Sequence, residues 1–190
     1  MKASVTTRLN LEMSVANEIV NVALTIKPAQ VTLVPERREE LTTEGGLDVA
    51  KLQVGLVPLI RNFSQAGIAV SLFIDPAIQQ VRAARETGAT TIELHTGRYA
   101  AATTPGAKSR ELAALAEAAR AGGDLGLAVA AGHGLDYGNV GAVAELSDVE
   151  EVNIGFSIIV RALSIGLEQA VREMVGLLKK GRQGHVLQAA

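Results

Sequence analysis

Two glutamates stand between apolar residues and could move protons. Glu12 lies in the stretch TRLNLEMS, and Glu93 lies in the stretch TTIELHTG. If both stretches are strands, the alternation of side chains places each carboxylate on the face opposite to its apolar neighbours. A carboxylate that is partly removed from water has a raised pKa and can shuttle protons. The pair suggests general acid–base chemistry, although Glu12 taken alone could equally be a surface carboxylate.

A glycine-rich stretch, AGHGLDYGN, offers an imidazole and accessible backbone amides. Here Gly132 and Gly134 flank His133, and further along Gly155 opens a helical stretch whose first amides could bind an anion. In barrels of parallel strands, phosphate groups bind between the loops after the last two strands and the N-terminus of a short helix. His133, Gly134, Gly155 and Phe156 occupy such places, so the sequence predicts a phosphate site. The alternative for His133 is a turn histidine on a flexible loop.

Two further stretches have a functional and a structural interpretation. His95 could join the site, or it could be a structural histidine bonded to neighbouring backbone. Residues 35–49, which include Thr42, form a polar loop longer than the usual ~2–6 residues and could be a lid that contacts a second anion; the alternative is a solvated connector. The three histidines lack the spacing of metal ligands, so no metal is expected.

Alternating strand and helix patterns must position these residues. Strands are predicted at residues 8–13, 30–35, 69–74, 91–95, 127–131 and 151–154, and helices at 15–26, 52–66, 78–87, 109–121, 140–146 and 167–180. This order implies right-handed βαβ units and a parallel sheet, either open and doubly wound or closed as a (β/α)8 TIM barrel. The barrel is favoured because polar residues share one register on three strands, and no G-x-G-x-x-G follows the first strand. Those polar residues are Glu12, Glu93, His95 and Asn153.

The length bounds the domain organisation. A full barrel runs to roughly 250 residues, whereas the chain has 190 and shows about six of the eight strand–helix units. We expect one barrel domain over residues 1–180, incomplete at its N-terminus by two units, and a flexible tail over residues 181–190.

The composition of the chain limits the classes of partner that it is expected to bind. The net charge of -2 and the aromatic content of 3% argue against nucleic acid, and no apolar run reaches the ~18 residues of a membrane span. There is no cysteine, which excludes disulfides. These features predict a cytoplasmic protein without nucleic acid or membrane as partner.

Extended motifs resemble one enzyme family. TRLNLEMS, LVPERREELTTEGGLDV, VSLFIDP, AGHGLDYGNV and NIGFSIIVRAL are closely similar to the pyridoxine 5′-phosphate synthase family, in the same order along the chain. The resemblance implies a (β/α)8 barrel that joins two phosphorylated substrates, 1-deoxy-D-xylulose 5-phosphate and 3-amino-2-oxopropyl phosphate, with no metal or organic cofactor. It also implies that Glu12 accepts a proton, His133 donates one and Glu93 stabilises charged intermediates. Thr42 would contact substrate, while Gly134, Gly155 and Phe156 would hold a phosphate.

The chain departs from the family in two places. The family usually has a histidine where this chain has Phe156, and the family's first two strands, with a further catalytic histidine and basic phosphate contacts, have no counterpart. We therefore expect little or no ring closure from these 190 residues alone. The alternatives are a non-catalytic truncated barrel that binds phosphate ligands or only oligomerises, and another sugar-phosphate enzyme on the same scaffold. Exposed strand edges would favour a homo-oligomer.

Overall fold

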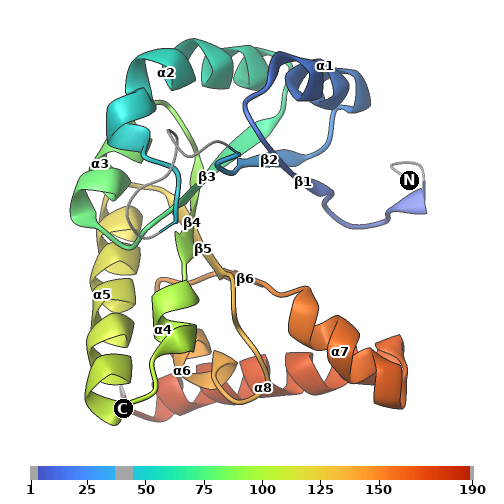
Figure 1. The fold of residues 1–190 in the computed structure, drawn as a ribbon, viewed down its shortest axis with the longest axis vertical. Coiled ribbons are helices and arrows are strands. Elements are labelled where there is room, and N and C mark those ends of the chain that lie inside the picture. Colours follow the sequence, from blue (N-terminus) through green and yellow to red (C-terminus); the bar gives the residue numbers. More distant parts are fainter. Residues whose placement is uncertain (1–3, 37–44, 189–190) are drawn as a thin grey trace.

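The computed structural model describes residues 4–36 and 45–188, with side chains as far as residue 182. Six strands alternate with helices along the chain (Figure 1). The strands are β1 (Asn10–Met13), β2 (Gln30–Leu33), β3 (Ala69–Ile74), β4 (Thr91–His95), β5 (Ala128–Gly132) and β6 (Glu151–Asn153). The helices are α1 (Asn17–Ile26), α2 (Val49–Gln65), α3 (Ile78–Glu86), α4 (Gly97–Ala101), α5 (Pro105–Asp124), α6 (Val140–Ala144), α7 (Phe156–Ile165) and α8 (Leu167–Gln188).

The strands form one parallel sheet in the order β1-β2-β3-β4-β5-β6, so each strand pairs with its neighbours in the chain. Successive βαβ units of one hand produce this order. The sheet curves with α1, α2, α3 and α5 on its outer side, while α6, α7 and α8 gather beyond β6 (Figure 1). The prediction of a partial (β/α) barrel is confirmed, and β1 and β6 are the two edges of a half-barrel.

Aliphatic side chains cover the outer face of the sheet. Leu33, Leu72, Ile92 and Val129 lie side by side in register on four adjacent strands. All four are at most 1% exposed and belong to one hydrophobic core with Phe63 of α2. Removing this apolar surface from water is the dominant favourable term in folding. Because the apolar face of each strand packs against the helices, its opposite face points toward the inside of the half-barrel.

The opposite, inner face is polar. Glu12, Thr32, Ser71 and Thr91 lie in one register across β1 to β4. Glu93 lies two residues beyond Thr91, in the layer nearer the carboxyl ends of the strands. Thr32 and Ser71 are buried, and the Ser71 hydroxyl has no hydrogen-bond partner among the described residues. The polar side chains of the sheet therefore lie on its inner face, whereas the hydrophobic core lies on its outer face.

Two helices begin earlier than the periodicity predicts because capping residues lie upstream. The side chain of Asp48 accepts a hydrogen bond from the amide of Lys51, so α2 begins at Val49 rather than at residue 52. The side chain of Thr104 accepts from Ala107, and Pro105 stands in the first turn, so α5 begins there rather than at residue 109. These caps satisfy amides that have no partner within the helix.

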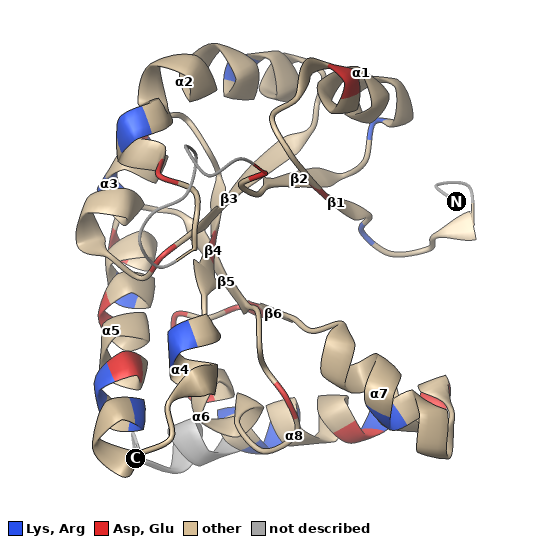
Figure 2. Cartoon of the chain, in the orientation of Figure 1, with Lys and Arg blue, Asp and Glu red and all other residues tan. Residues whose placement is uncertain are grey.

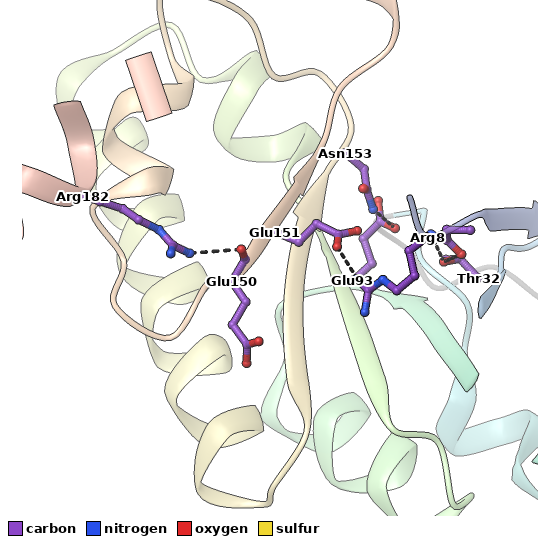
Figure 3. A network of polar contacts seen from close by, with 8 residues as sticks. Arg8, Thr32, Glu93, Glu150, Glu151, Asn153 and Arg182 are labelled. Atoms are coloured by element: carbon purple, nitrogen blue, oxygen red, sulfur yellow. Dashed lines mark hydrogen bonds and ion pairs between the residues drawn. The ribbon is translucent and has the colours of Figure 1, made fainter. Parts of the chain in front are cut away.

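Helix α8 continues beyond residue 180, whereas the sequence suggested a flexible tail over residues 181–190. The helix reaches Gln188, and Gly181 packs so closely that an added Cβ would lie 2.9 Å from the Cβ of Ala144. The guanidinium of Arg182 donates to the backbone carbonyls of Val149 and Glu150, each at 3.0 Å. Figure 3 shows the bond to Glu150. These contacts with α6 and the segment before β6 extend the helix past the predicted boundary.

The helical surface carries charges of both signs. Figure 2 shows acidic and basic positions interspersed along α5 and α8. None of the helices in residues 4–36 and 45–188 combines the length and the apolar character needed to cross a membrane.

An ion pair joins the two edges of the half-barrel. Arg8, just before β1, donates to the carboxylate of Glu151 on β6 at 2.6 Å (Figure 3). The two side chains are 63% and 39% exposed, so the pair contributes only about 0–1 kcal/mol. The bridge orients the segment before β1, but it does not replace strand pairing between β1 and β6.

Candidate active site

A cavity of about 1540 Å³ lies against the inner face of the half-barrel. Its lining includes the predicted site residues Glu12, Glu93, His133, Gly134, Gly155 and Phe156. These residues come from β1, β4, the loops after β5 and β6 and the first turn of α7, which a parallel sheet brings to one end. Thr42 lies outside the described residues. The structure therefore gathers the predicted acid–base residues and the predicted phosphate-binding residues around one space.

Glu93 is the most deeply buried carboxylate of this cavity. Its carboxylate accepts a hydrogen bond of 2.7 Å from the side-chain amide nitrogen Nδ2 of Asn153 (Figure 3), and the residue is 4% exposed. Gly132 on β5 makes room for it, because a Cβ at position 132 would lie 2.2 Å from the Glu93 carboxylate. Glu93 is thus held between two neighbouring strands with one oxygen fixed by Asn153.

Burial raises the pKa of Glu93 to about 7. Desolvation is the largest cause, the hydrogen bond from Asn153 opposes it, and the charges of Glu12 and Glu151 raise the pKa further. A carboxyl group with this pKa is present in both protonation states near neutral pH. It can therefore accept or release a proton without a large energetic cost.

Glu12 occupies a different environment. It lies on β1 in register with Thr32, one layer below Glu93, and its side chain is exposed. The cavity wall includes both carboxylates, and their mutual repulsion contributes to the raised pKa of Glu93. The two glutamates thus differ in solvation although they line the same cavity.

His133 stands on a strained turn directly after β5. Its φ is 82°, a conformation that is costly for a residue with a side chain. The hydroxyl of Thr96 lies 2.7 Å from the carbonyl oxygen of Gly132 and 2.5 Å from that of His133, and it can donate to either. His133 is exposed at the cavity, yet the neighbouring protein partly desolvates its ring and thereby lowers its pKa, and the nearby His95 lowers the pKa further. The turn holds the imidazole at the cavity in a form that gives up its proton readily.

The loops after β5 and β6 meet beside the N-terminus of α7. Gly134 has a φ of 74°, and Gly155 is the residue that precedes α7, where no side chain caps the helix. The hydroxyl of Ser157 donates to the carbonyl of Leu135 at 2.9 Å and joins the two loops. The first amides of a helix have no partner within it and favour an anion. Phe156 follows at 85% exposure and adds no polar side chain.

The sequence-based list omitted three residues that shape this site. The strand pattern places Asn153 in the polar register, yet its contact with Glu93 spans 60 positions and has no local signal in the sequence. Asp75 follows β3 in the motif VSLFIDP and lies 3.3 Å from a ring nitrogen of His95. Arg161 of α7 lines the cavity and is paired with Glu173 of α8. A polar residue just after a parallel strand is a signal that could have identified Asp75.

No cluster suited to a metal is found in the part of the chain that the structure describes. Residues 4–36 and 45–182 contain no group of three or more His, Cys, Asp or Glu side chains that could hold an ion. The polar groups of the cavity include the three carboxylates of Glu12, Glu93 and Asp136, the imidazole of His133, the guanidinium of Arg161 and backbone amides. Such a set suits proton transfer and anion binding.

Comparisons with known proteins agree with this arrangement. Residues 1–180 match the family model described as pyridoxal phosphate biosynthesis protein PdxJ. The chain is 52% identical over 180 residues to pyridoxine 5′-phosphate synthase of Trichlorobacter lovleyi, covering 95% of this chain and 75% of that protein. It is 54% identical over 178 residues to pyridoxine 5′-phosphate synthase of Thermosynechococcus vestitus, covering 94% of this chain and 75% of that protein.

A solved structure shows the same fold at low sequence identity. A mandelate oxidase variant superposes with a TM-score of 0.59 and 16% identity, over 96% of this chain and 59% of that chain. This likeness concerns the barrel architecture alone, since fold does not fix function.

Proposed function

The chain belongs to the PdxJ family of pyridoxal phosphate biosynthesis proteins, and from this membership we propose a role for each residue of the cavity. The function is that of a pyridoxine 5′-phosphate synthase in vitamin B6 biosynthesis. The proposed reaction condenses 1-deoxy-D-xylulose 5-phosphate with 3-amino-2-oxopropyl phosphate and releases inorganic phosphate and water. The observation that carries the proposal is the meeting of Glu93, His133 and the N-terminus of α7 around one cavity.

Glu93 would stabilise charged intermediates of the condensation. Its pKa of about 7 allows it to be neutral beside an anion and ionised beside a cation. Imine formation and dehydration create such charges in turn, and a poorly solvated carboxylate interacts with them more strongly than one in water. Asn153 would keep the carboxylate oriented while its protonation changes.

Glu12 and His133 would exchange protons with the substrates. We propose Glu12 as the proton acceptor, because its exposed carboxylate lines the same cavity as the buried Glu93. We propose His133 as the proton donor, because a lowered pKa makes its imidazolium a stronger acid. The strained turn beneath His133 would limit the reorientation of its ring during the reaction.

The loop after β5 and the start of α7 would bind a substrate or product phosphate. The proposed donors are the backbone amides at Gly134, Gly155 and Phe156, and Thr42 is proposed as a substrate contact. An added Cβ at Gly155 would meet nothing within 4 Å, so the glycine leaves space there for a ligand. The helix N-terminus supplies both donors and a favourable dipole for an anion.

We also propose that the chain associates with copies of itself. Phe156 and Leu163 of α7 are each 85% exposed, and Leu167 of α8 is 56% exposed. Exposed apolar side chains that lie close together commonly mark an interface.

Turnover and phosphate binding test these roles together. A version extended at its N-terminus by the two strand–helix units predicted from the family is given both substrates. Pyridoxine 5′-phosphate is then measured with Glu12→Gln and with Glu117→Gln, a control on the exposed face of α5. We expect Glu12→Gln to lower turnover by roughly 10²–10⁴-fold and Glu117→Gln to leave it unchanged. Equal turnover in both variants would remove Glu12 from the mechanism.

Binding is followed separately by titrating inorganic phosphate into labelled protein. The amide signals of Gly134 and Gly155 should shift before those of other residues. Phosphate binding without any product in the extended version would contradict the proposed catalytic roles, and shifts confined to other regions would contradict the proposed phosphate site.

A further inference from the structure

Three aromatic rings meet beside the cavity. The ring centroids of His95 and His133 are 4.8 Å apart with an interplanar angle of 63°. Phe73 of β3 lies 5.0 Å from His95 and 6.4 Å from His133. Aromatic rings prefer such edge-to-face arrangements over parallel stacking without offset. The orientation of His133 is therefore tied to that of His95.

A buried carboxylate fixes His95 in turn. Oδ1 of Asp75 lies 3.3 Å from Nδ1 of His95, and the two side chains are 5% and 10% exposed. The amide of Gly46 also donates to Asp75 Oδ1, at 3.1 Å. A carboxylate at Nδ1 favours the tautomer that carries its proton there, and it fixes the plane of the ring.

The glycine at position 97 leaves room for the rings of His95 and His133. A Cβ at Gly97 would lie 2.6 Å from Nε2 of His95 and 3.3 Å from Cδ2 of His133. Thr96, between His95 and Gly97, is fully buried and holds the backbone of His133 through its hydroxyl. The segment after β4 thus accommodates both imidazole rings at Gly97 and contacts the backbone of His133 through Thr96.

We propose that Asp75 and His95 form a positioning pair that sets the orientation and the proton affinity of His133. The Asp75 carboxylate would fix the tautomer of His95, and the His95 ring would hold the imidazole of His133 toward the cavity. The inference rests on the proposed role of His133 as proton donor and adds two residues that act through it. Neither Asp75 nor His95 is among the described residues that line the cavity.

Several groups near His133 influence the pKa of its imidazole. Burial is the larger cause of its lowered pKa, and the charge of His95 is the second. Other charged groups also line the cavity, and they are present in every variant. They are Glu12 of β1, Glu93 of β4, Asp136 of the loop that carries His133, and Arg161 of α7.

Imidazole NMR spectra test the pair without requiring turnover. The chain has three histidines, so His185→Gln assigns the third and leaves the signals of His95 and His133. Removal of the neighbouring imidazole in His95→Gln should move the titration midpoint of His133 upward, toward the usual value of about 6.5. Asp75→Asn should abolish the preference of His95 for a proton on Nδ1 and shift the ring signals of His133.

The controls separate a positioning role from a general loss of structure. Asp124→Asn changes an exposed aspartate at the end of α5 and should leave all imidazole signals in place. If His95→Gln loses the native amide spectrum, His95→Phe keeps a ring at that position and removes the nitrogen that Asp75 contacts. His133 signals identical to those of the unmodified chain in Asp75→Asn and in the folded His95 variant would overturn the proposal.

Kinetics distinguish this inference from the proposed function. In the version extended by the two predicted strand–helix units, a lower kcat at unchanged KM in Asp75→Asn would support the pair, with a loss smaller than the roughly 10²–10⁴-fold typical of general acid–base catalysis. Undiminished turnover in His133→Gln would refute the proton-donor role, while the NMR result for the pair would still stand.

Discussion

Replacement of Glu93 by glutamine should change how the stability of the protein depends on pH. The carboxyl group has a pKa of about 7 in the folded chain, compared with its ordinary 4.5. Because the folded state binds this proton more tightly than the unfolded state does, the free energy of unfolding falls as pH rises from about 4.5 to about 7. Below this window Glu93 is protonated in both states, and above it the full cost of burying the charge is present.

The magnitude follows from the difference between the two pKa values. Each tenfold change in proton affinity corresponds to 1.36 kcal/mol, so ionised Glu93 costs ~3 kcal/mol of stability above neutral pH. Glutamine keeps the shape and can still accept the hydrogen bond from Asn153, but it carries no charge at any pH. Glu93→Gln should therefore gain ~3 kcal/mol relative to the unmodified protein between pH 4.5 and pH 8.

Urea unfolding at several pH values between 4.5 and 8 measures this effect. The quantity of interest is the difference between the two proteins, since all other groups titrate in both. Glu117→Gln, exposed on α5, serves as the control and should give a difference within about 0.5 kcal/mol that does not vary with pH. A flat difference for Glu93→Gln as well would show that the carboxylate is not desolvated and would refute the reasoning for its raised pKa.

Two other substitutions address the turn and the phosphate site. Thr96→Val keeps the shape of a fully buried side chain but removes its hydrogen bonds to Gly132 and His133, so it should cost about 1–3 kcal/mol in urea unfolding. Thr96→Ser should recover most of that loss, and equal stability of all three proteins would contradict the role of the hydroxyl. Phe156→His places a titratable hydrogen-bond donor at an 85% exposed position beside Gly155. At pH 5.5 this variant should bind inorganic phosphate more tightly than the unmodified protein does. The gain in affinity should be lost by about pH 8, because the imidazole is then deprotonated. Calorimetry that finds the same gain at both pH values would show that the imidazolium charge is not responsible.

Local patterns in the sequence determined the strands and the faces they present. The side-chain period of two places Ile92 and Leu94 on the apolar face and Glu93 on the other, whatever the rest of the chain does. The same rule identified the inward position of Glu12, and the glycines around His133 marked a loop where backbone could approach a ligand. The resemblance to one enzyme family then related these positions to a reaction, which the family comparisons support.

Only the tertiary structure decided what each of these residues touches. The curvature of the sheet brings Asn153 to Glu93 across 60 positions, and this contact together with burial sets the acid–base character of the carboxyl group. The contact of Asp75 with His95 likewise joins the ends of β3 and β4, 20 positions apart. Local periodicity reports which side of an element is apolar, but a pKa and a ring orientation depend on neighbours that arrive from other strands. For this reason the sequence could place the carboxylates and the imidazole at the cavity, whereas the protonation and the positioning of those groups required the assembled half-barrel.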